Sequence, residues 1–118
     1  MRIISLSGTT NTAGALMVSA SESLHGLLYA VQLVDGALAD GVDITLTCEQ
    51  ESLSIPLLTK ADFNTDQIVY PRVAEALNTN GSALTTYSMP LINGVPKMVL
   101  AAGGATAAGG CILYIVEA

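Results

Sequence analysis

The residues that could perform acid–base or nucleophilic chemistry are few and isolated in this chain. His25 is the only histidine, and it lies in the apolar stretch Leu24–Val34. A general base must lie beside the group it activates, and no serine sits in a G-x-S-x-G turn. We therefore interpret His25 as a structural or surface residue. We predict no catalytic residue and expect that the protein is not an enzyme.

The two cysteines, Cys48 and Cys111, lie in the alternating segment TLTC and the apolar segment CILYIV. Neither has a histidine or a second cysteine at the spacing of zinc ligands. A disulfide is the alternative, but no feature of the sequence brings their Cα atoms within bonding range. We predict two buried free thiols that behave as small apolar residues, which fits a reducing site of synthesis.

Acidic side chains come closest to a metal motif. Asp62, Asn64 and Asp66 approximate the spacing of a calcium loop, but the glycine and the distant bidentate glutamate of such a loop are missing. Glu49 and Glu51 would share one face of an extended segment. We expect a solvated turn at residues 62–66, with no bound metal and no cofactor.

The composition describes one domain, residues 1–118, with a modest core. Apolar residues make up 51% of the chain and charged residues 12%, and the net charge is −6. Phosphate backbones attract clustered cations, but Arg2, Lys60, Arg72 and Lys97 are scattered, so direct contact with nucleic acid is not expected. A core with one Phe and no Trp buries little area, which favours oligomerisation.

The uncharged run Met98–Val116 is long enough to span a bilayer. Two Gly-Gly pairs within 103–110 disfavour a helix, and no cluster of Lys or Arg flanks the run. A phosphate-binding loop would need a following helix, whereas here a β-prone segment follows. We predict a strand–glycine loop–strand hairpin and no membrane partner. The first residues lack the continuous apolar region of a secretory signal.

Alternation of apolar and polar residues predicts strands in the middle of the chain. Ile44, Leu46 and Cys48 share one face of Val42–Cys48, and the same period continues through Leu53–Leu57. The short link Glu49–Glu51 predicts a hairpin between them. Pro56 cannot donate a ladder hydrogen bond, so its strand should lie at an edge or a bulge.

Two other features predict extended structure. Leu24–Val34 is apolar on both faces, as expected for a strand covered on both sides, and Tyr29 and Tyr114 are expected to be buried. Gly26 indicates a bulge or bend. Asn93-Gly94 lies between MPLI and VPKMVL and predicts a hairpin turn.

The remaining segments complete an all-β fold. Arg2–Leu6, Ala15–Ala20 and Gln67–Tyr70 are predicted strands, and only Val73–Leu77 has helical character. About eight short strands with frequent turns indicate an antiparallel β-sandwich or a small β-barrel. The polar segment Ser5–Gly14 predicts a flexible N-terminal arm within residues 1–14, with a plain β connection as the alternative.

Short segments spread over residues 24–117 together resemble the small virion proteins of tailed bacteriophages that decorate or cement the capsid. The segments are Gly26-Leu-Leu-Tyr-Ala with Gly41-Val-Asp-Ile-Thr-Leu-Thr, Pro56-Leu-Leu-Thr-Lys60 with Tyr70-Pro-Arg72, and Val95-Pro-Lys-Met-Val-Leu with Gly103-Gly104 and Cys111–Val116. The first 23 residues lie outside this resemblance.

The resemblance implies a non-enzymatic structural protein on the outer surface of the capsid. It would bind the major capsid protein and itself, as a homotrimer at capsid symmetry axes. Two alternatives remain: another virion subunit of the tail or connector, or a β module that binds a small ligand or carbohydrate. Sugar sites usually need exposed aromatic rings, and this chain offers only Phe63 and tyrosines 29, 70, 87 and 114.

Overall fold

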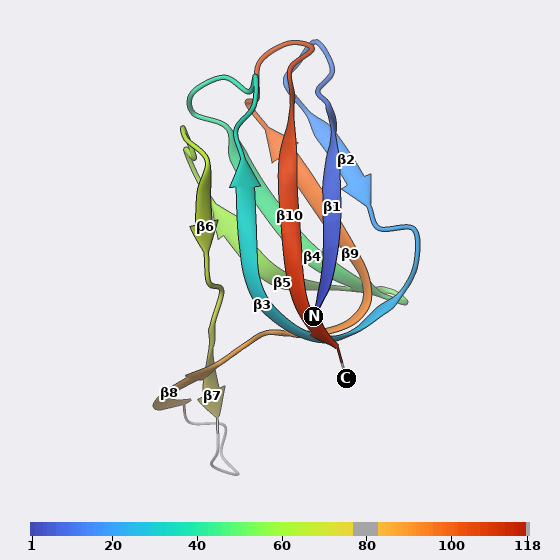
Figure 1. Ribbon diagram of the computed structural model, residues 1–118, viewed down its shortest axis with the longest axis vertical. Coiled ribbons are helices and arrows are strands. Elements are labelled where there is room, and N and C mark those ends of the chain that lie inside the picture. Colours follow the sequence, from blue (N-terminus) through green and yellow to red (C-terminus); the bar gives the residue numbers. More distant parts are fainter. Residues whose placement is uncertain (77–82, 118) are drawn as a thin grey trace.

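The computed structural model describes residues 1–76 and 83–117, apart from the side chains of 74–76 and 83–86. This part of the chain contains ten β-strands and no helix (Figure 1). The strands are β1 (Arg2–Thr9), β2 (Leu16–Ser19), β3 (Leu24–Val34), β4 (Asp43–Gln50), β5 (Leu53–Lys60), β6 (Gln67–Val69), β7 (Val73–Ala76), β8 (Ala83–Ser88), β9 (Leu91–Ala101) and β10 (Ala108–Glu117). The predicted all-β fold is therefore confirmed.

Eight strands form a sandwich of two antiparallel layers (Figure 1). The front layer has the order β1-β10-β3-β6, and the back layer has the order β2-β9-β4-β5. One corner joins the layers, because the first four residues of β3 pair with the first four of β9. This is the strand order of a double-sheet jelly roll.

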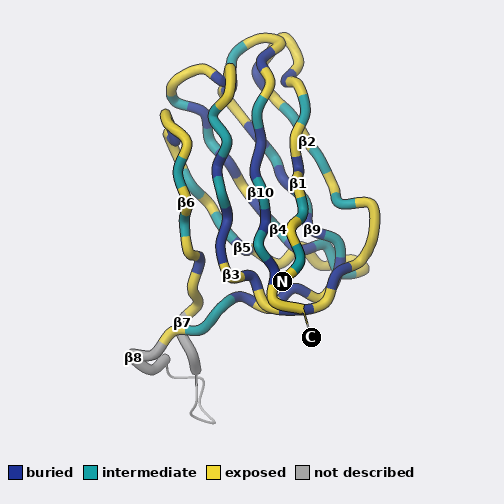
Figure 2. The backbone as a smooth tube through the Cα atoms, viewed as in Figure 1, coloured by how far each residue is buried: buried dark blue, intermediate teal, exposed yellow. Residues whose placement is uncertain are grey.

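The core lies between the layers and contains mainly aliphatic side chains. Ile44, Leu46 and Cys48 of β4 are buried as the alternation predicts. Phe63, from the loop after β5, is fully buried, and its backbone N–H donates to the carbonyl of Val42 at 3.1 Å. Figure 2 shows buried and exposed residues alternating along the strands, as expected when each layer has one inner face.

The predicted hairpin at the centre of the sequence is confirmed. β4 and β5 pair antiparallel, and the two-residue turn between them places Glu51 at a φ of 53°. Pro56 lies in β5, which is an edge strand, and next to the register shift between Leu46 and Thr47. Pro56 therefore occupies a position that needs no ladder hydrogen bond.

Two predicted local structures are wrong. Val73–Ala76 is strand β7, paired with β8, and not a helix; Leu77 lies outside the described residues. Asn93-Gly94 lies inside β9 and not in a turn, because β9 changes partner there from β3 to β4. The close approach of the Glu49 backbone leaves no room for a Cβ at position 94, which explains the glycine.

The glycine-rich segment near the C-terminus is a link between layers. β9 and β10 are strands as predicted, but β9 lies in the back layer and β10 in the front layer, so they do not form the predicted hairpin. Among the described residues, no helix is long and apolar enough to cross a membrane.

The beginning of the chain is not a free arm. Residues 2–9 form β1, which pairs with β10 from Arg2 opposite Ile115 to Thr9 opposite Ala108. The alternative prediction, a β connection, describes this segment. In the second half of the chain, β7 and β8 form a separate two-stranded sheet that extends beyond the sandwich (Figure 1).

Candidate functional site

The outward face of the front layer is the candidate functional surface, and we call it the uncharged face. Its outward positions contain no Asp, Glu, Lys or Arg side chain. They are Ile3, Ser5, Ser7, Thr9, Leu27, Tyr29, Ala30, Gln32, Val34, Ile68, Tyr70, Ala108, Gly110, Ile112, Tyr114 and Val116. A four-stranded face of this composition that is open to solvent is a candidate interaction site.

Large apolar side chains on this face are strongly exposed. The exposed fraction is 61% for Ile3, 52% for Ile68 and 55% for Tyr70. Each comes from a different element: β1, β6 and the residue that follows β6. Because β1 and β6 are the two edges of the front layer, exposed apolar side chains occur on both sides of the face.

A β-bulge creates the aromatic part of the face. The register between β3 and β10 shifts so that Tyr114 pairs with Ala30 while Ile115 pairs with Leu28, which leaves Tyr29 without a partner. A bulge breaks the strict alternation of sides, so Tyr29 and Ala30 both belong to the outward surface. Tyr29 is 42% exposed, whereas Ala30 is only 3% exposed.

Tyr29, Tyr70 and Arg72 form one packed group at the edge of the face. The two rings lie edge to face with centroids 5.8 Å apart, and the Arg72 guanidinium is 5.8 Å and 6.0 Å from the ring centroids of Tyr29 and Tyr70. Arg72 Nη1 also donates to the Tyr29 carbonyl at 3.0 Å. These contacts hold the rings in place while leaving much of their surface exposed.

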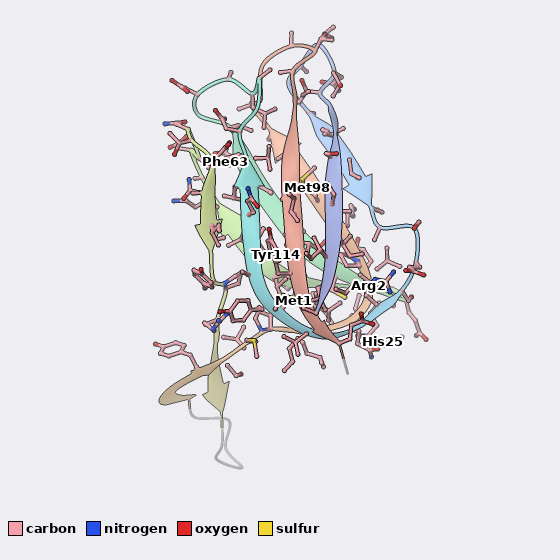
Figure 3. The ribbon with its side chains drawn as sticks, in the orientation of Figure 1. Met1, Arg2, His25, Phe63, Met98 and Tyr114 are labelled. Carbon is pink, nitrogen blue, oxygen red and sulfur yellow. The ribbon has the colours of Figure 1, made fainter. Side chains whose placement is uncertain are left out.

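We call this region of the face the bulky end. It includes a shallow pocket of about 230 Å³ lined by Met1, Tyr29, Ala30, Ile68, Tyr70 and Tyr114. Figure 3 places Met1 and Tyr114 on the front layer. The Tyr114 hydroxyl donates to Gln32 Oε1 at 3.0 Å, which orients that ring across β3.

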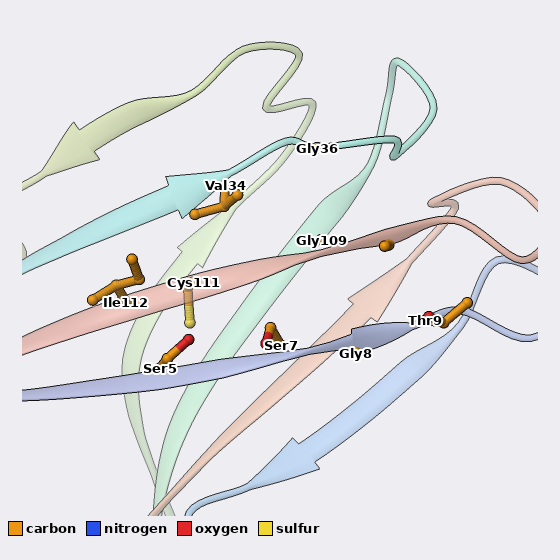
Figure 4. Close-up of a pocket in the computed structure, with 10 residues that line it drawn as sticks. Ser5, Ser7, Gly8, Thr9, Val34, Gly36, Gly109, Cys111 and Ile112 are labelled. Carbon is orange, nitrogen blue, oxygen red and sulfur yellow. The ribbon is translucent and has the colours of Figure 1, made fainter.

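The other end of the same face is a hollow of about 480 Å³ (Figure 4). Its floor is formed by small residues, because Gly110 lies opposite Ser7 and Gly109 lies opposite Gly8 in the β1–β10 ladder. Val34 and Ile112 stand at its sides. The uncharged face thus has a bulky end and a hollow end along β10.

The outward face of the back layer has a different composition. Lys97 and Glu49 form an ion pair at 3.3 Å, and the Ser54 hydroxyl donates to the Glu49 carboxylate. The hydrogen bond from Ser54, followed by Lys97, lowers the pKa of Glu49 below its ordinary value. Charges that pair across strands in this way are typical of a face that remains in water.

His25 and the two cysteines make contacts within the fold. His25 Nδ1 is 2.6 Å from Asn93 Oδ1, its cross-strand partner at the corner between the layers. Cys48 and Cys111 are unbonded, and their predicted burial is confirmed. Burial raises the pKa of the Cys48 thiol, and it raises the pKa of Cys111 to about 12, so both remain thiols at neutral pH.

Asp62, Asn64 and Asp66 each take part in a hydrogen bond between a backbone amide and a side-chain oxygen. Asn64 Oδ1 accepts from Gly41 N at 2.7 Å, and Asp66 Oδ1 accepts from Asp35 N at 2.8 Å. Asp62 is held by its own N–H, which donates to Asp43 Oδ1 at 3.0 Å. No group of three or more His, Cys, Asp or Glu side chains in the described ranges is arranged to hold a metal ion.

Sequence reasoning missed the tyrosines of the candidate surface. Tyr29 was expected to be buried and is exposed, and Tyr114 is only partly buried. A signal was nonetheless present, because Leu24–Val34 is apolar on both faces. In a single chain, the described residues place no further layer over the outward face of this strand.

No protein-family model, curated protein or solved structure compared with this chain matches it.

Proposed function

We propose that this protein is a non-enzymatic structural protein of a phage virion that decorates the outside of the capsid as an oligomer. The observation that carries the proposal is the uncharged face, which exposes Ile3, Ile68 and Tyr70 on a chain with a net charge of −6. Such a face is costly to leave in water and is stabilised when another protein covers it.

The fold and the sequence resemblance support this role in different ways. Double-sheet jelly rolls are used by viral capsid domains, and also by lectins and cupins, so the fold alone does not select a function. The resemblance of residues 24–117 to capsid-decorating proteins supports the virion role among these. The partners under this proposal are the major capsid protein and further copies of the chain.

A capsid lattice also suits a protein that binds as a symmetric oligomer. The lattice offers many identical sites, so a symmetric oligomer can engage several of them through contacts that are individually weak. Binding of this kind requires complementary surfaces, and it requires neither a conformational change nor catalytic chemistry.

Electron microscopy of the virus that encodes the chain tests the proposal. Gold-labelled antibody against the purified protein should mark the outer capsid surface, and reconstruction should show density at repeated lattice positions. Particles made without the gene should lack that density, and adding the purified protein should restore it. Label confined to the tail or connector, or absent from the particle, would overturn the proposal.

A carbohydrate-binding role is the second candidate, and the exposure of Tyr29 and Tyr70 favours it. Sugars stack on exposed aromatic rings, and these two rings lie on the protein surface. However, the rings are nearly perpendicular, at 80°, and Arg72 lies over both of them. A screen against immobilised glycans tests this role: binding that Tyr70→Ala removes would support it, and no binding would reject it.

A further inference from the structure

We propose that the uncharged face is the surface through which copies of this chain associate, with the bulky end of one copy seated on the hollow of the next. The inference rests on the proposed function and deepens it by naming the occupant of this face as a second copy of the chain. The capsid then contacts other surfaces of the oligomer.

The distribution of charge favours a second copy as the occupant. Two identical acidic chains repel each other, so they associate best where neither carries acidic side chains. The acidic residues of the chain lie in loops, in β4, in β7 and at the end of β10, and none lies at an outward position of the front layer. The uncharged face is therefore a broad surface on which two copies can meet without opposing carboxylates.

The shape of the face is complementary to itself. β10 runs from the hollow at Gly109 to the bulky end at Tyr114, so the hollow and the exposed side chains of Ile68 and Tyr70 lie toward opposite ends of one surface. A two-fold axis in the plane of the face and perpendicular to the strands brings the bulky end of each copy onto the hollow of the other. A head-to-tail ring uses the same two ends between successive copies.

The size of the face is sufficient for association. Four strands spaced about 4.8 Å apart, over roughly eight residues of about 3.3 Å each, cover about 500 Å² in projection. Protruding side chains make the accessible area larger than the projected area. The face thus approaches the roughly 800 Å² that each partner contributes to an interface of standard size.

The bulky end has the composition of an interface centre. Tyr and Arg are enriched among residues that dominate binding energy, and here Tyr29, Tyr70 and Arg72 are already packed against each other. Side chains held in place before association lose little conformational entropy when a partner covers them.

A charge placed on the face tests the proposal, with a matched control on the other layer. Ile68→Glu introduces a carboxylate at the bulky end, and Met17→Glu introduces one at an equally open position of β2, where the methionine is 64% exposed. Sedimentation equilibrium should show an oligomer for the wild type and for Met17→Glu. Ile68→Glu should weaken association by at least roughly 100-fold, because a buried unpaired charge is costly.

A second pair of variants tests the shape argument without charge. Ser7→Trp fills the hollow from an exposed position of β1, and Thr45→Trp adds the same ring at an exposed position of β4. Ser7→Trp should shift the protein toward monomer, and Thr45→Trp should not. Far-ultraviolet circular dichroism of all four variants checks that the β fold is intact.

The outcomes separate this inference from the proposed function. A wild-type monomer, or an Ile68→Glu variant that remains fully associated, would overturn the inference. If Ile68→Glu remained an oligomer but no longer bound particles lacking the protein, the face would be the capsid contact and the inference would be wrong while the function stood. An oligomer that Ile68→Glu dissociates, but that never binds those particles, would support the inference and contradict the function.

Discussion

At the scale of single residues, Thr10 is the buried polar side chain with the clearest structural task. It lies just after β1 and is 3% exposed. Its Oγ1 donates to the Gly104 carbonyl at 2.6 Å and accepts from the Ala107 N–H at 2.9 Å. One hydroxyl therefore ties the start of the chain to the glycine-rich link between the layers.

Replacing Thr10 by valine should destabilise the fold without changing its shape. Thr10→Val keeps the volume but leaves the partly buried Gly104 carbonyl and the buried Ala107 N–H without the threonine hydroxyl, which costs roughly 1–3 kcal/mol of unfolding free energy. Urea denaturation measures the change. Thr45→Val, at an exposed position, should remain within about 0.5 kcal/mol of wild type. Equal losses in the two variants would contradict the role of Thr10.

Cys111 should make the free energy of unfolding decrease at alkaline pH. Its pKa is about 12 in the fold, against 9.0 for an ordinary thiol, because burial disfavours the thiolate. Because the pKa is raised in the fold, the stabilisation that comes from keeping Cys111 protonated is complete below pH 9.0 and is lost as the pH rises toward 12. The unfolding free energy should fall by up to about 1.4 kcal/mol per pH unit in this window.

The control for this pH dependence is Cys111→Ala. The variant should be less stable than the wild type at neutral pH, but its unfolding free energy should fall less steeply with pH through the alkaline window. Denaturant titrations at several pH values compare the two slopes. Parallel slopes would show that the thiolate penalty of Cys111 does not contribute.

At the scale of elements, the spacing between β1 and β10 depends on a glycine. A Cβ at position 110 would meet the backbone carbonyl of Leu6 and the Cα of Ser7, neither of which can move without shifting the strand. A Cβ at Gly8 would instead meet the side-chain tip of Leu16 at 3.3 Å, which can rotate away. Gly110 and Gly8 therefore differ in how much an added side chain would destabilise the fold.

Alanine substitutions at these two positions should separate them. Gly110→Ala should lower the unfolding free energy by about 1–3 kcal/mol through strand displacement. Gly8→Ala should cost less than about 1 kcal/mol, because only a flexible side chain must adjust. Thermal unfolding of both variants measures the difference, and a larger loss for Gly8→Ala would be the contrary result.

Local patterns predicted the elements that depend on neighbouring residues. The alternation in Val42–Cys48, the short link after it and the position of Pro56 are all set within one hairpin, and the structure confirms them. The turn assigned to Asn93-Gly94 was wrong because this glycine is needed where β9 passes close to β4, a requirement set by residues some 45 positions earlier. Tyr29 was misplaced because its exposure follows from a bulge against β10, which no pattern in β3 reveals.

At the scale of the whole molecule, the jelly-roll order could not be predicted from the sequence. The predominance of strands follows from period and turn signals, but the assignment of strands to layers depends on contacts between distant segments. β9 and β10 illustrate this, because they are consecutive in the chain and lie in opposite layers. The uncharged face exists only once that order brings β1, β10, β3 and β6 together.

The pairing of the first and last strands has a mechanical consequence. Arg2 lies opposite Ile115, so a load applied through Met1 and Val116 pulls the β1–β10 ladder open from one end, breaking its hydrogen bonds one after another. β1 is an edge strand and can peel away from the front layer. A load applied through Thr9 and Val116 instead slides the two strands along each other, so the whole ladder resists at once. In an optical trap, the first attachment should unfold the protein at a lower force than the second.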